Sequence, residues 1–578
     1  MRQRNYGPWA PRVARMLTIG VTAGALGACD SLLEVTLPHV LTEEAIQSAA
    51  TSEVQVNSAI ALFECGYTAY GLRALGEEGT MASIAGVFSG GHVYGPSAVT
   101  GSCDTGDTSS AWFDQIMGAR GMLSTDPALL VPTAKGTVTS AFPVGRGIYD
   151  RIRNEFGVAN VTNGERLSAL AALYVAMSIT HIGEFMCDIA FDGSNLVSPP
   201  AALQIAEDWV TNRALVHGAA VPGGSGFVLP FGITTSATAN TGGTFAEAAL
   251  ALRARIRWAR GDLTGAELDA ASVLGTRSRF TQWVTRDAGN TRRNKIFYNP
   301  TAVGFSGILG LNTWWNPAGN RANNPATGAP WPTIIPFTGY KFLGIDPTTG
   351  RTLASGTNNI PVRYANETRG AGDAVENCRV TSSVGCVVGA VADSRVTHFI
   401  KQIQGPGRHE VPSKYTSEND DVPYMTWEEL TLIRAEKLNM VDNTTVARTT
   451  AIGYVNGIRT AKSLPLIAGA YLTELTNGTN DQAEVRAMLL EERRREFYAE
   501  GGRFHSTGIQ NTDLIWFPRL QGATPNSSAY QLGGSVRLLT DGQEYNLNEY
   551  LLAAGGPSAR GTGCASLGPL PGAQVPLF

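Results

Sequence analysis

Charged residues are scarce in this sequence. Asp, Glu, Lys and Arg make up 16% of the chain, against about 25% in an ordinary globular protein. The formal net charge is −4, so there is no basic excess to attract nucleic acid. Glycine and proline are abundant instead, with 66 and 29 residues, and hydrophobic residues make up 43%. The composition therefore predicts a sizeable core connected by long, uncharged loops.

Patterns that signal catalysis are also missing. The chain has no H-E-x-x-H, no G-x-S-x-G and no phosphate-binding glycine motif. Its seven His are scattered, and His181 lies in an apolar run that favours a core histidine. The acid pairs Asp420-Asp421 and Glu428-Glu429 are adjacent in sequence, which does not establish two carboxylates facing each other across a cleft. No Cys or His pair has metal-ligand spacing. We expect a protein that is not an enzyme and holds no metal or cofactor.

The first 28 residues have the pattern of a lipoprotein signal peptide. A basic N-terminal region precedes the apolar run 16–25, and Leu26-Gly27-Ala28-Cys29 places small residues before a cysteine. This resembles a bacterial lipobox and predicts cleavage before Cys29 and lipidation of that residue. An ordinary secretory signal is the alternative. The apolar run is too short to span a bilayer, so we expect a lipid-tethered mature chain, 29–578.

Export outside the cytosol allows disulfides among the remaining six cysteines, which permit 15 pairings. Cys378 and Cys386 are close in sequence and can close a surface loop, so we favour that bridge. Cys65–Cys103 is a weaker candidate.

Helical patterns lie in two blocks, about 41–275 and 424–505. In the first, 43–75 reads as a helix broken near Gly66, and 165–182 is apolar nearly all round and therefore central. The segment 245–274 holds two Ala-rich helices joined by Gly261-Asp262. Small residues at helical spacing predict a close antiparallel pair, similar to a tetratricopeptide unit. The segments 424–438 and 447–461 predict a second pair.

The intervening segment, about 276–415, is irregular and ligand-sided in our interpretation, with short strands and hairpins. Within it, 299–340 has a single charged residue, Arg321. Aromatic rings can stack on sugar faces, and Asn can bond hydroxyl groups as donor and acceptor. Either these side chains bind an uncharged polyhydroxyl ligand, or they form small cores within the loops. The candidate ligand-binding residues are Trp314, Trp315, Trp331, Asn312, Tyr340 and, from an earlier Gly-rich loop, Tyr94.

The stretch 485–503 predicts a helix stopped by Gly501-Gly502. Its apolar face, with Val485, Met488 and Leu489, continues into charged residues. A charge on the buried side needs a partner, so we expect a structural ion network. Pairing along the helix, from Glu492 to Glu496 with Arg493 between, would supply part of it. The network residues are Glu492, Arg493, Glu496 and Glu500; Glu491, Arg494, Arg495 and Tyr498 are expected to face outward.

The pattern E-R-x-x-E-F-x-x-E-G-x-R at 492–503 resembles the C-terminal signature of the SusD/RagB family of outer-membrane nutrient-binding lipoproteins. The family's following Asp-Leu-x-Arg element is absent, since 504–507 reads Phe-His-Ser-Thr. Arg434-Ala435-Glu436 and Asn456-Gly-Ile-Arg459, followed by Leu464-Pro465, resemble two further family elements in the same order.

The resemblance implies a mostly α-helical, tetratricopeptide-like scaffold over 29–578. It further implies capture of a nutrient, here an oligosaccharide, on the outer face of the outer membrane. The ligand would pass to a SusC-like, TonB-dependent β-barrel transporter. Peptide binding within the same family is the alternative, and a secreted surface hydrolase is a third possibility from another class.

Overall fold

The computed structural model describes, with short gaps, residues 48–77, 141–229, 243–297, 395–500 and 549–555. The gaps are 186–188, 192–194, 288–292, 295–296, 396–397, 402–408, 413, 465, 469–471, 474, 479–480 and 498–499. The helices of the first block are α2 (Ser52–Glu77), α4 (Ala141–Asp150), α5 (Gly164–Phe185), α6 (Pro199–Asp208), α7 (Leu215–Ala220), α8 (Phe245–Ala259) and α9 (Leu263–Thr276). Those of the second block are α11 (Trp427–Lys437), α12 (Thr445–Ala461), α14 (Asp481–Glu496) and α17 (Glu549–Ala553).

Shorter helical turns extend or join these helices. They are η1 (Ala49–Thr51), η3 (Arg151–Phe156), η4 (Val158–Asn160), η5 (Trp209–Ala214) and η10 (Leu438–Asp442), of which η3, η5 and η10 are π-helical. The described strands form two-stranded antiparallel pairs: β1 (Ile189–Ala190) with β2 (Leu196–Val197), β3 (Thr281–Val284) with β6 (Val422–Thr426), and β4 (His398–Lys401) with β5 (His409–Pro412). The described chain is thus mostly α-helical, as predicted.

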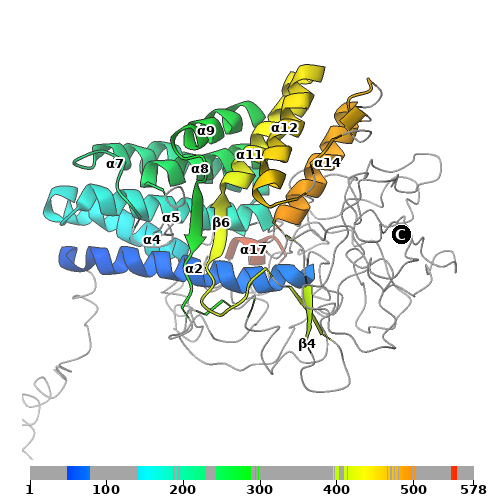
Figure 1. Ribbon diagram of the computed structural model, residues 1–578. Helices are drawn as coiled ribbons and strands as arrows, with labels where there is room; N and C mark the ends of the chain where they lie inside the picture. Colours follow the sequence, from blue (N-terminus) through cyan, green and yellow to red (C-terminus); the bar gives the residue numbers. More distant parts are fainter. Residues whose placement is uncertain are drawn as a thin grey trace, which may run out of the picture.

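The helices pack as successive pairs. α4 packs on α5, α8 on α9 and α11 on α12, and α9 also contacts α11, so the two predicted tetratricopeptide-like pairs lie next to each other (Figure 1). Gly261 has a φ of 86°, which only glycine adopts readily, and the Asp262 side chain then accepts from the amide of Gly265 at 2.9 Å to begin α9. The helix-pair prediction is confirmed.

α5 is the central helix. Apart from the partly exposed Glu165 and Arg166 in its first turn, its described side chains through Glu184 are buried. Among the described residues, α5 is the one helix long and apolar enough to cross a membrane, and the window that passes this test is wholly buried inside the protein. A core helix explains that composition, because α5 contacts α2, α4, α6, α7 and α8 on all sides.

Two details differ from the sequence-based expectations. α2 runs through Gly66 without a break. A glycine inside a helix costs about 1 kcal/mol, and the buried stripe of Val56, Ile60, Phe63 and Tyr67 outweighs that cost. The expected helix start at Tyr424 is also wrong, because Val422–Thr426 is strand β6.

The strand is explained by Pro423 and by burial. Proline lacks an amide donor and is tolerated at irregular points of a sheet. Pro423 pairs with Trp283 where the register between β3 and β6 shifts. All five residues of β6 are buried. Thr426 then caps α11 by accepting from the Glu429 amide at 3.3 Å, so the helix begins after the strand.

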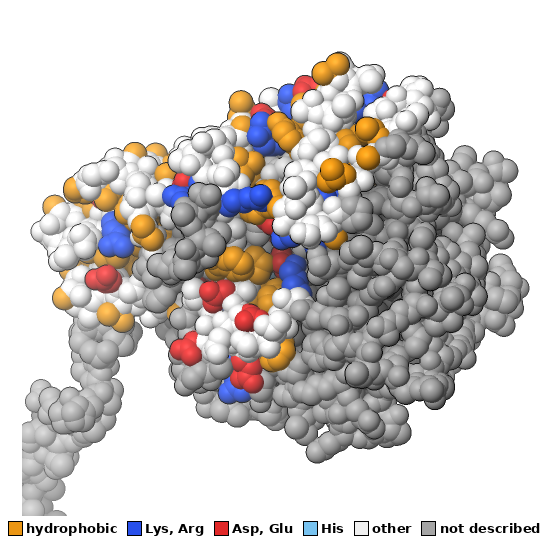
Figure 2. Space-filling view, in the orientation of Figure 1, with side chains coloured by type: hydrophobic (Ala, Val, Ile, Leu, Met, Phe, Trp, Pro, Cys, Tyr) orange, Lys and Arg blue, Asp and Glu red, His pale blue; other side chains and the backbone are white. Residues whose placement is uncertain are grey.

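The core has two parts. The larger cluster joins α2, α4, α5, α6, α8 and α9 with β6. The smaller cluster joins α11, α12 and α14, and includes Leu432, Ile452, Val455, Met488 and Leu489. The face of the molecule in Figure 2 shows apolar side chains interspersed with charged ones over the helical scaffold.

Candidate functional site

Buried charges gather on α14, where the sequence predicts an ion network. Glu492 accepts from Arg395 Nη1 at 2.8 Å and from Arg459 Nη1 at 2.5 Å, and all three side chains are at most 3% exposed. Arg395 also lies 3.5 Å from Glu496. These partners come from the middle segment and from α12. The described pairs therefore cross between elements, rather than running along α14 as the sequence suggested.

Arg493 joins α14 to α11 and α8. Its Nε and Nη2 donate to Glu436 Oε1 at 2.9 and 2.8 Å, while Trp258 Nε1 donates to Glu436 Oε2 at 2.5 Å. The guanidinium also lies 4.1 Å from the Trp258 ring centre. The Glu436 carboxylate thus accepts from donors on two helices, and a cation–π contact joins the two donor residues, Arg493 and Trp258, to each other.

A third group of charges lies around Lys462. Its Nζ is 2.9 Å from Glu428 and 3.1 Å from Glu496. Burial alone lowers the pKa of Lys462, but the carboxylates of Glu496 and Glu428 outweigh it and hold this pKa above the ordinary value. Burial and the neighbouring Glu496 raise the pKa of Glu428.

Glu500 completes the charged centre from beyond the end of α14. It pairs with Lys414, whose Nζ also donates to the carbonyl oxygen of Glu496 at 2.8 Å. Burial, followed by repulsion from Glu496 and Glu428, raises the pKa of Glu500 to about 7 despite the opposing Lys414 charge. Tyr67 and Tyr415 are buried beside it, and burial and Glu500 both raise their pKa.

Of the four predicted network residues, Glu492, Glu496 and Glu500 are therefore linked through shared cations, and Arg493 pairs with Glu436. Arg495 is different from the expectation: it was assigned to the outer face, but it is 1% exposed. α14 is surrounded on more sides than its apolar stripe indicates, because α11, α12 and η10 all contact it.

The family-like elements of the sequence meet at this centre. Glu436 comes from the first, Arg459 from the second, and Glu492 and Arg493 from the third. Asn456 has another role: its amide donates to the Ile467 carbonyl at 3.0 Å and accepts from the Ile467 amide at 2.8 Å. It thereby holds the chain that follows α12, as a paired backbone would.

Sequence reasoning missed several members of the centre, namely Arg395, Lys414 and Lys462. Their partners lie far away in sequence; Arg395 and Glu492 are 97 positions apart. The sequence did single out Arg459 and Glu436, because both lie in the motifs that resemble family elements.

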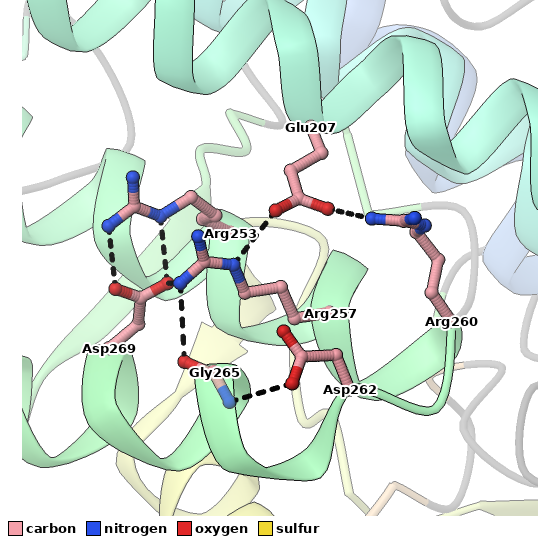
Figure 3. A network of polar contacts seen from close by, with 7 residues as sticks. All are labelled: Glu207, Arg253, Arg257, Arg260, Asp262, Gly265 and Asp269. Carbon is pink, nitrogen blue, oxygen red and sulfur yellow. Dashed lines mark hydrogen bonds and ion pairs between the residues drawn. The ribbon is translucent and has the colours of Figure 1, made fainter.

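A second network of polar contacts fastens the first helix pair (Figure 3). Asp269 on α9 accepts from Arg253 at 2.7 and 2.8 Å and from Arg257 at 3.0 Å, both on α8. Glu207 on α6 accepts from Arg257 at 2.9 Å and also pairs with Arg260. This network ties three helices together through polar contacts, in addition to their apolar packing.

The acids considered for catalysis have structural partners. Asp420 accepts from the amide of Ser417 at 2.9 Å and caps its own loop, and Asp421 accepts from the Arg286 amide at 2.7 Å. Glu429 binds Arg255 at 2.5 and 2.8 Å. His181 is buried, with its ring centre 5.5 Å from that of Tyr67. No group of three or more metal-binding side chains occurs within the described ranges.

The predicted ligand-binding residues Trp314, Trp315, Trp331, Asn312, Tyr340 and Tyr94 lie outside the described residues, as do Cys29, Cys378 and Cys386. The structure instead describes both ends of the middle segment. At its start, β3 pairs with β6, and Asn294 donates to the Asp420 carbonyl at 2.9 Å. At its end, Arg395 and Lys414 reach α14. Both ends are therefore attached to the second helical block.

The geometry defines a helix-pair scaffold to which one long inserted segment is attached at both ends: its start through the β3–β6 pair, and its end through the charged centre. No family model matches the chain. A curated relative, the SusD-like protein P38 of Formosa agariphila, is 34% identical over 116 residues, which cover 18% of this chain and 22% of the relative. The match thus spans about a fifth of that protein's length.

The solved structures to which the chain is similar include SusD-like proteins. A SusD-like carbohydrate binding protein from Bacteroides vulgatus has a TM-score of 0.43 at 12% identity, covering 86% of this chain and 96% of its own. Surface glycan-binding protein A from Bacteroides uniformis has a TM-score of 0.38 at 13% identity, covering 85% and 95%. The chain is thus similar to a SusD-like relative over 18% of its length, in agreement with the resemblance of its motifs to the SusD/RagB family.

Proposed function

We propose that this protein is a cell-surface binding protein for neutral oligosaccharides. The observation that carries the proposal is the composition of 299–340, which is rich in aromatic and Asn residues and has one charged residue, Arg321. Stacking rings and amides suit sugar faces and hydroxyl groups, whereas an acidic or phosphorylated ligand would need cations. Trp314, Trp315, Trp331, Asn312, Tyr340 and Tyr94 are the proposed contacts.

The attachment of the middle segment supports this assignment. A binding surface must be held in place by a rigid support, or ordering it costs binding free energy. The start of the segment is fixed by the β3–β6 pair, and its end by Arg395 and Lys414. The aromatic stretch lies between these two attachments in the sequence. We infer that the scaffold presents it to the medium.

The family likeness supports the cellular context. The basic N-terminus, the apolar run and the cysteine at position 29 suit a lipoprotein signal, with 1–28 removed and 29–578 forming the binding domain. We infer an outer-membrane protein anchored through Cys29 and facing outward. It would deliver ligand to a SusC-like, TonB-dependent transporter and act as a lid over that barrel. The transporter would supply the energy, and this chain would supply affinity.

A carbohydrate binding protein and a glycan-binding protein are among the solved structures to which this chain is similar, in keeping with a carbohydrate ligand. Peptide binding within the same family is the nearest alternative. A binding role is favoured over hydrolysis, since Asp420, Asp421, Glu428 and Glu429 serve as structural partners.

The test is calorimetric titration of the lipid-free protein with a panel of neutral oligosaccharides and of peptides of similar size. We expect heat from at least one oligosaccharide and none from the peptides. Binding of peptides alone would replace the ligand class. Release of shorter sugars from any panel member during overnight incubation with purified protein would instead establish a hydrolase.

A further inference from the structure

Arginine side chains and aromatic rings line one side of α11. Trp427, Thr431 and Arg434 follow one another at four and three positions, which places them on the same side of the helix. They are half-buried, and the residues between them are buried. Arg434 donates to Glu267 on α9 at 3.1 Å, and its guanidinium lies 4.9 Å from the ring centre of Tyr454 on α12. Solvent therefore reaches α11 along this side, between α9 and α12 (Figure 1).

Arg279 covers the ring at the start of this side. It lies in the turn that joins α9 to β3, and its guanidinium carbon is 3.8 Å from the ring centre of Trp427. At that distance the guanidinium is in direct contact with the ring face. A stacked arginine is held in place while its N–H donors remain available at the edge of the stack. We refer to Arg279, Trp427, Thr431, Arg434 and Tyr454 as the α11 face.

Arg279 is also the one charged residue of this region without a charged partner. The stretches 263–279 and 427–462 are described throughout, and each of their other charged side chains is in an ion pair. No hydrogen bond or ion pair joins Arg279 to a described residue. A molecule that covers the α11 face therefore has one cation to match, and a carboxylate matches a guanidinium in both charge and shape.

We propose that the α11 face docks an acidic segment of another protein, with a carboxylate of that segment bound to Arg279. A carboxylate can accept two parallel N–H bonds from one guanidinium. Arg434 uses its Nε for Glu267, so its terminal amino groups can bind a second carboxylate. Trp, Tyr and Arg are the residue types that contribute most to protein interfaces. Here helices and stacking hold them in position, which lowers the entropy lost on binding.

The contacts of the α11 face favour a peptide over a sugar. Stacking of a sugar needs a bare ring, but Arg279 covers Trp427 and Arg434 covers Tyr454. Both rings also pack against the smaller core cluster. Thr431 Oγ1 donates to the Trp427 carbonyl oxygen at 2.7 Å and can still accept from an N–H donor, which a peptide backbone supplies. The face is therefore distinct from the proposed sugar contacts.

The spacing of the two arginines defines a probe. Trp427, under Arg279, and Arg434 are seven positions apart, which is about 10 Å along a helix. A polyproline-II segment has three residues per turn and rises about 3.1 Å per residue, so acids three positions apart share a side at about 9 Å. The probe is a fluorescein-labelled peptide that repeats Glu-Leu-Gly, and the matched control peptide repeats Gln-Leu-Gly.

Fluorescence anisotropy with the whole lipid-free protein measures docking. The Glu peptide should bind to wild type, and the Gln peptide should not. Arg279→Met removes one charge-assisted contact and should weaken binding about 10-fold. Arg279→Lys keeps the charge but loses the planar fork, so it should also weaken binding. Arg146→Met is the control, because Arg146 lies on α4 in an exposed pair with Asp150; it should bind as wild type does.

Two results would overturn the proposal at this stage. One is the absence of Glu-peptide binding to wild type at concentrations up to about 1 mM, the weak end of measurable affinities. The other is an equal loss in Arg279→Met and Arg146→Met, which would show attraction to positive charge in general.

Thr431→Glu tests the same face without changing either arginine. The added carboxylate would lie between Arg279 and Arg434 and repel an acidic segment, so binding of the Glu peptide should weaken. Thr431→Gln has nearly the same shape without the charge and should retain binding. Equal affinity in the two variants would contradict the proposal.

Sugar titrations separate this face from the proposed ligand site. Arg279→Met should bind a neutral oligosaccharide as wild type does, and a loss of that affinity would assign the α11 face to the ligand and overturn the docking role. Binding of a galacturonate trimer, without binding of the Glu peptide, would replace the acidic peptide by an acidic sugar and so contradict the proposal.

Discussion

Replacing Arg493 by methionine tests whether the buried charges hold the scaffold together. Methionine keeps much of the side-chain volume and removes the cation. Glu436 would then lose two donors, at 2.9 and 2.8 Å, and keep the Trp258 donor at 2.5 Å. Breaking a buried ion pair from one side costs about 3–5 kcal/mol of unfolding free energy. Loss of the contact with the Trp258 ring, 4.1 Å away, adds about 1 kcal/mol.

The loss of unfolding free energy in Arg493→Met has an upper bound that depends on pH. An abandoned buried carboxylate can take up a proton, and for an acid of ordinary pKa this costs about 3.7 kcal/mol at pH 7 and about 1 kcal/mol at pH 5. We therefore expect Arg493→Met to lose about 4 kcal/mol at pH 7, and about 2–3 kcal/mol less than that at pH 5. Urea unfolding at the two pH values measures both numbers.

A double-mutant cycle separates the ion pair from general damage. Adding Glu436→Gln removes the abandoned charge, so the double variant should be more stable at pH 7 than the sum of the single losses by about 2 kcal/mol. The control is Arg434→Met, whose pair with Glu267 is 27% and 22% exposed and is worth at most about 1 kcal/mol. Equal losses in Arg493→Met and Arg434→Met, or strict additivity in the cycle, would refute the reasoning.

Two further changes test the helix pair. Thr244→Ala removes the hydroxyl that accepts from the Glu247 amide at the start of α8 and should cost about 1 kcal/mol in thermal unfolding. Thr244→Ser should keep most of that stability, and an equal loss in both variants would argue against the cap. Gly218→Ala places a methyl group 2.4 Å from the Phe245 ring and should cost about 1–3 kcal/mol. In Gly275→Ala, on α9, the added methyl group meets nothing within 4 Å, and the variant should be more stable by about 0.5–1 kcal/mol. A change in unfolding free energy of the same sign in both glycine variants would contradict the close packing of Gly218 on Phe245.

Local patterns predicted the helices well because each pattern depends on near neighbours. The pair α8–α9 follows from alanines at helical spacing and the Gly261-Asp262 turn, all within about thirty residues. The central position of α5 follows from its apolar composition. Gly66 misled because a single weak helix former is outweighed by packing against α4 and α5, which the local sequence does not show.

The charged centre was half predictable. The apolar face of α14 leads directly into Glu492 and Arg493, which indicates that they are buried. Their partners could not be read off, because Arg395, Arg459 and Glu436 approach from separate elements. Pairing along the helix was the local guess, and the tertiary fold supplies partners across elements instead. The same limitation hid Lys414 and the environment of Glu500.

The most direct test of the account is calorimetric titration of one neutral oligosaccharide from the panel into wild type and into a variant with both Trp314→Ala and Trp315→Ala. Stacking of a sugar on an aromatic side chain needs the ring, which alanine lacks. The double substitution should therefore abolish measurable binding, while the melting temperature of the scaffold stays within about 2 °C of wild type. Unchanged affinity in the double variant would contradict the claim that this aromatic stretch, held by the buried charges of the helix-pair scaffold, binds the ligand.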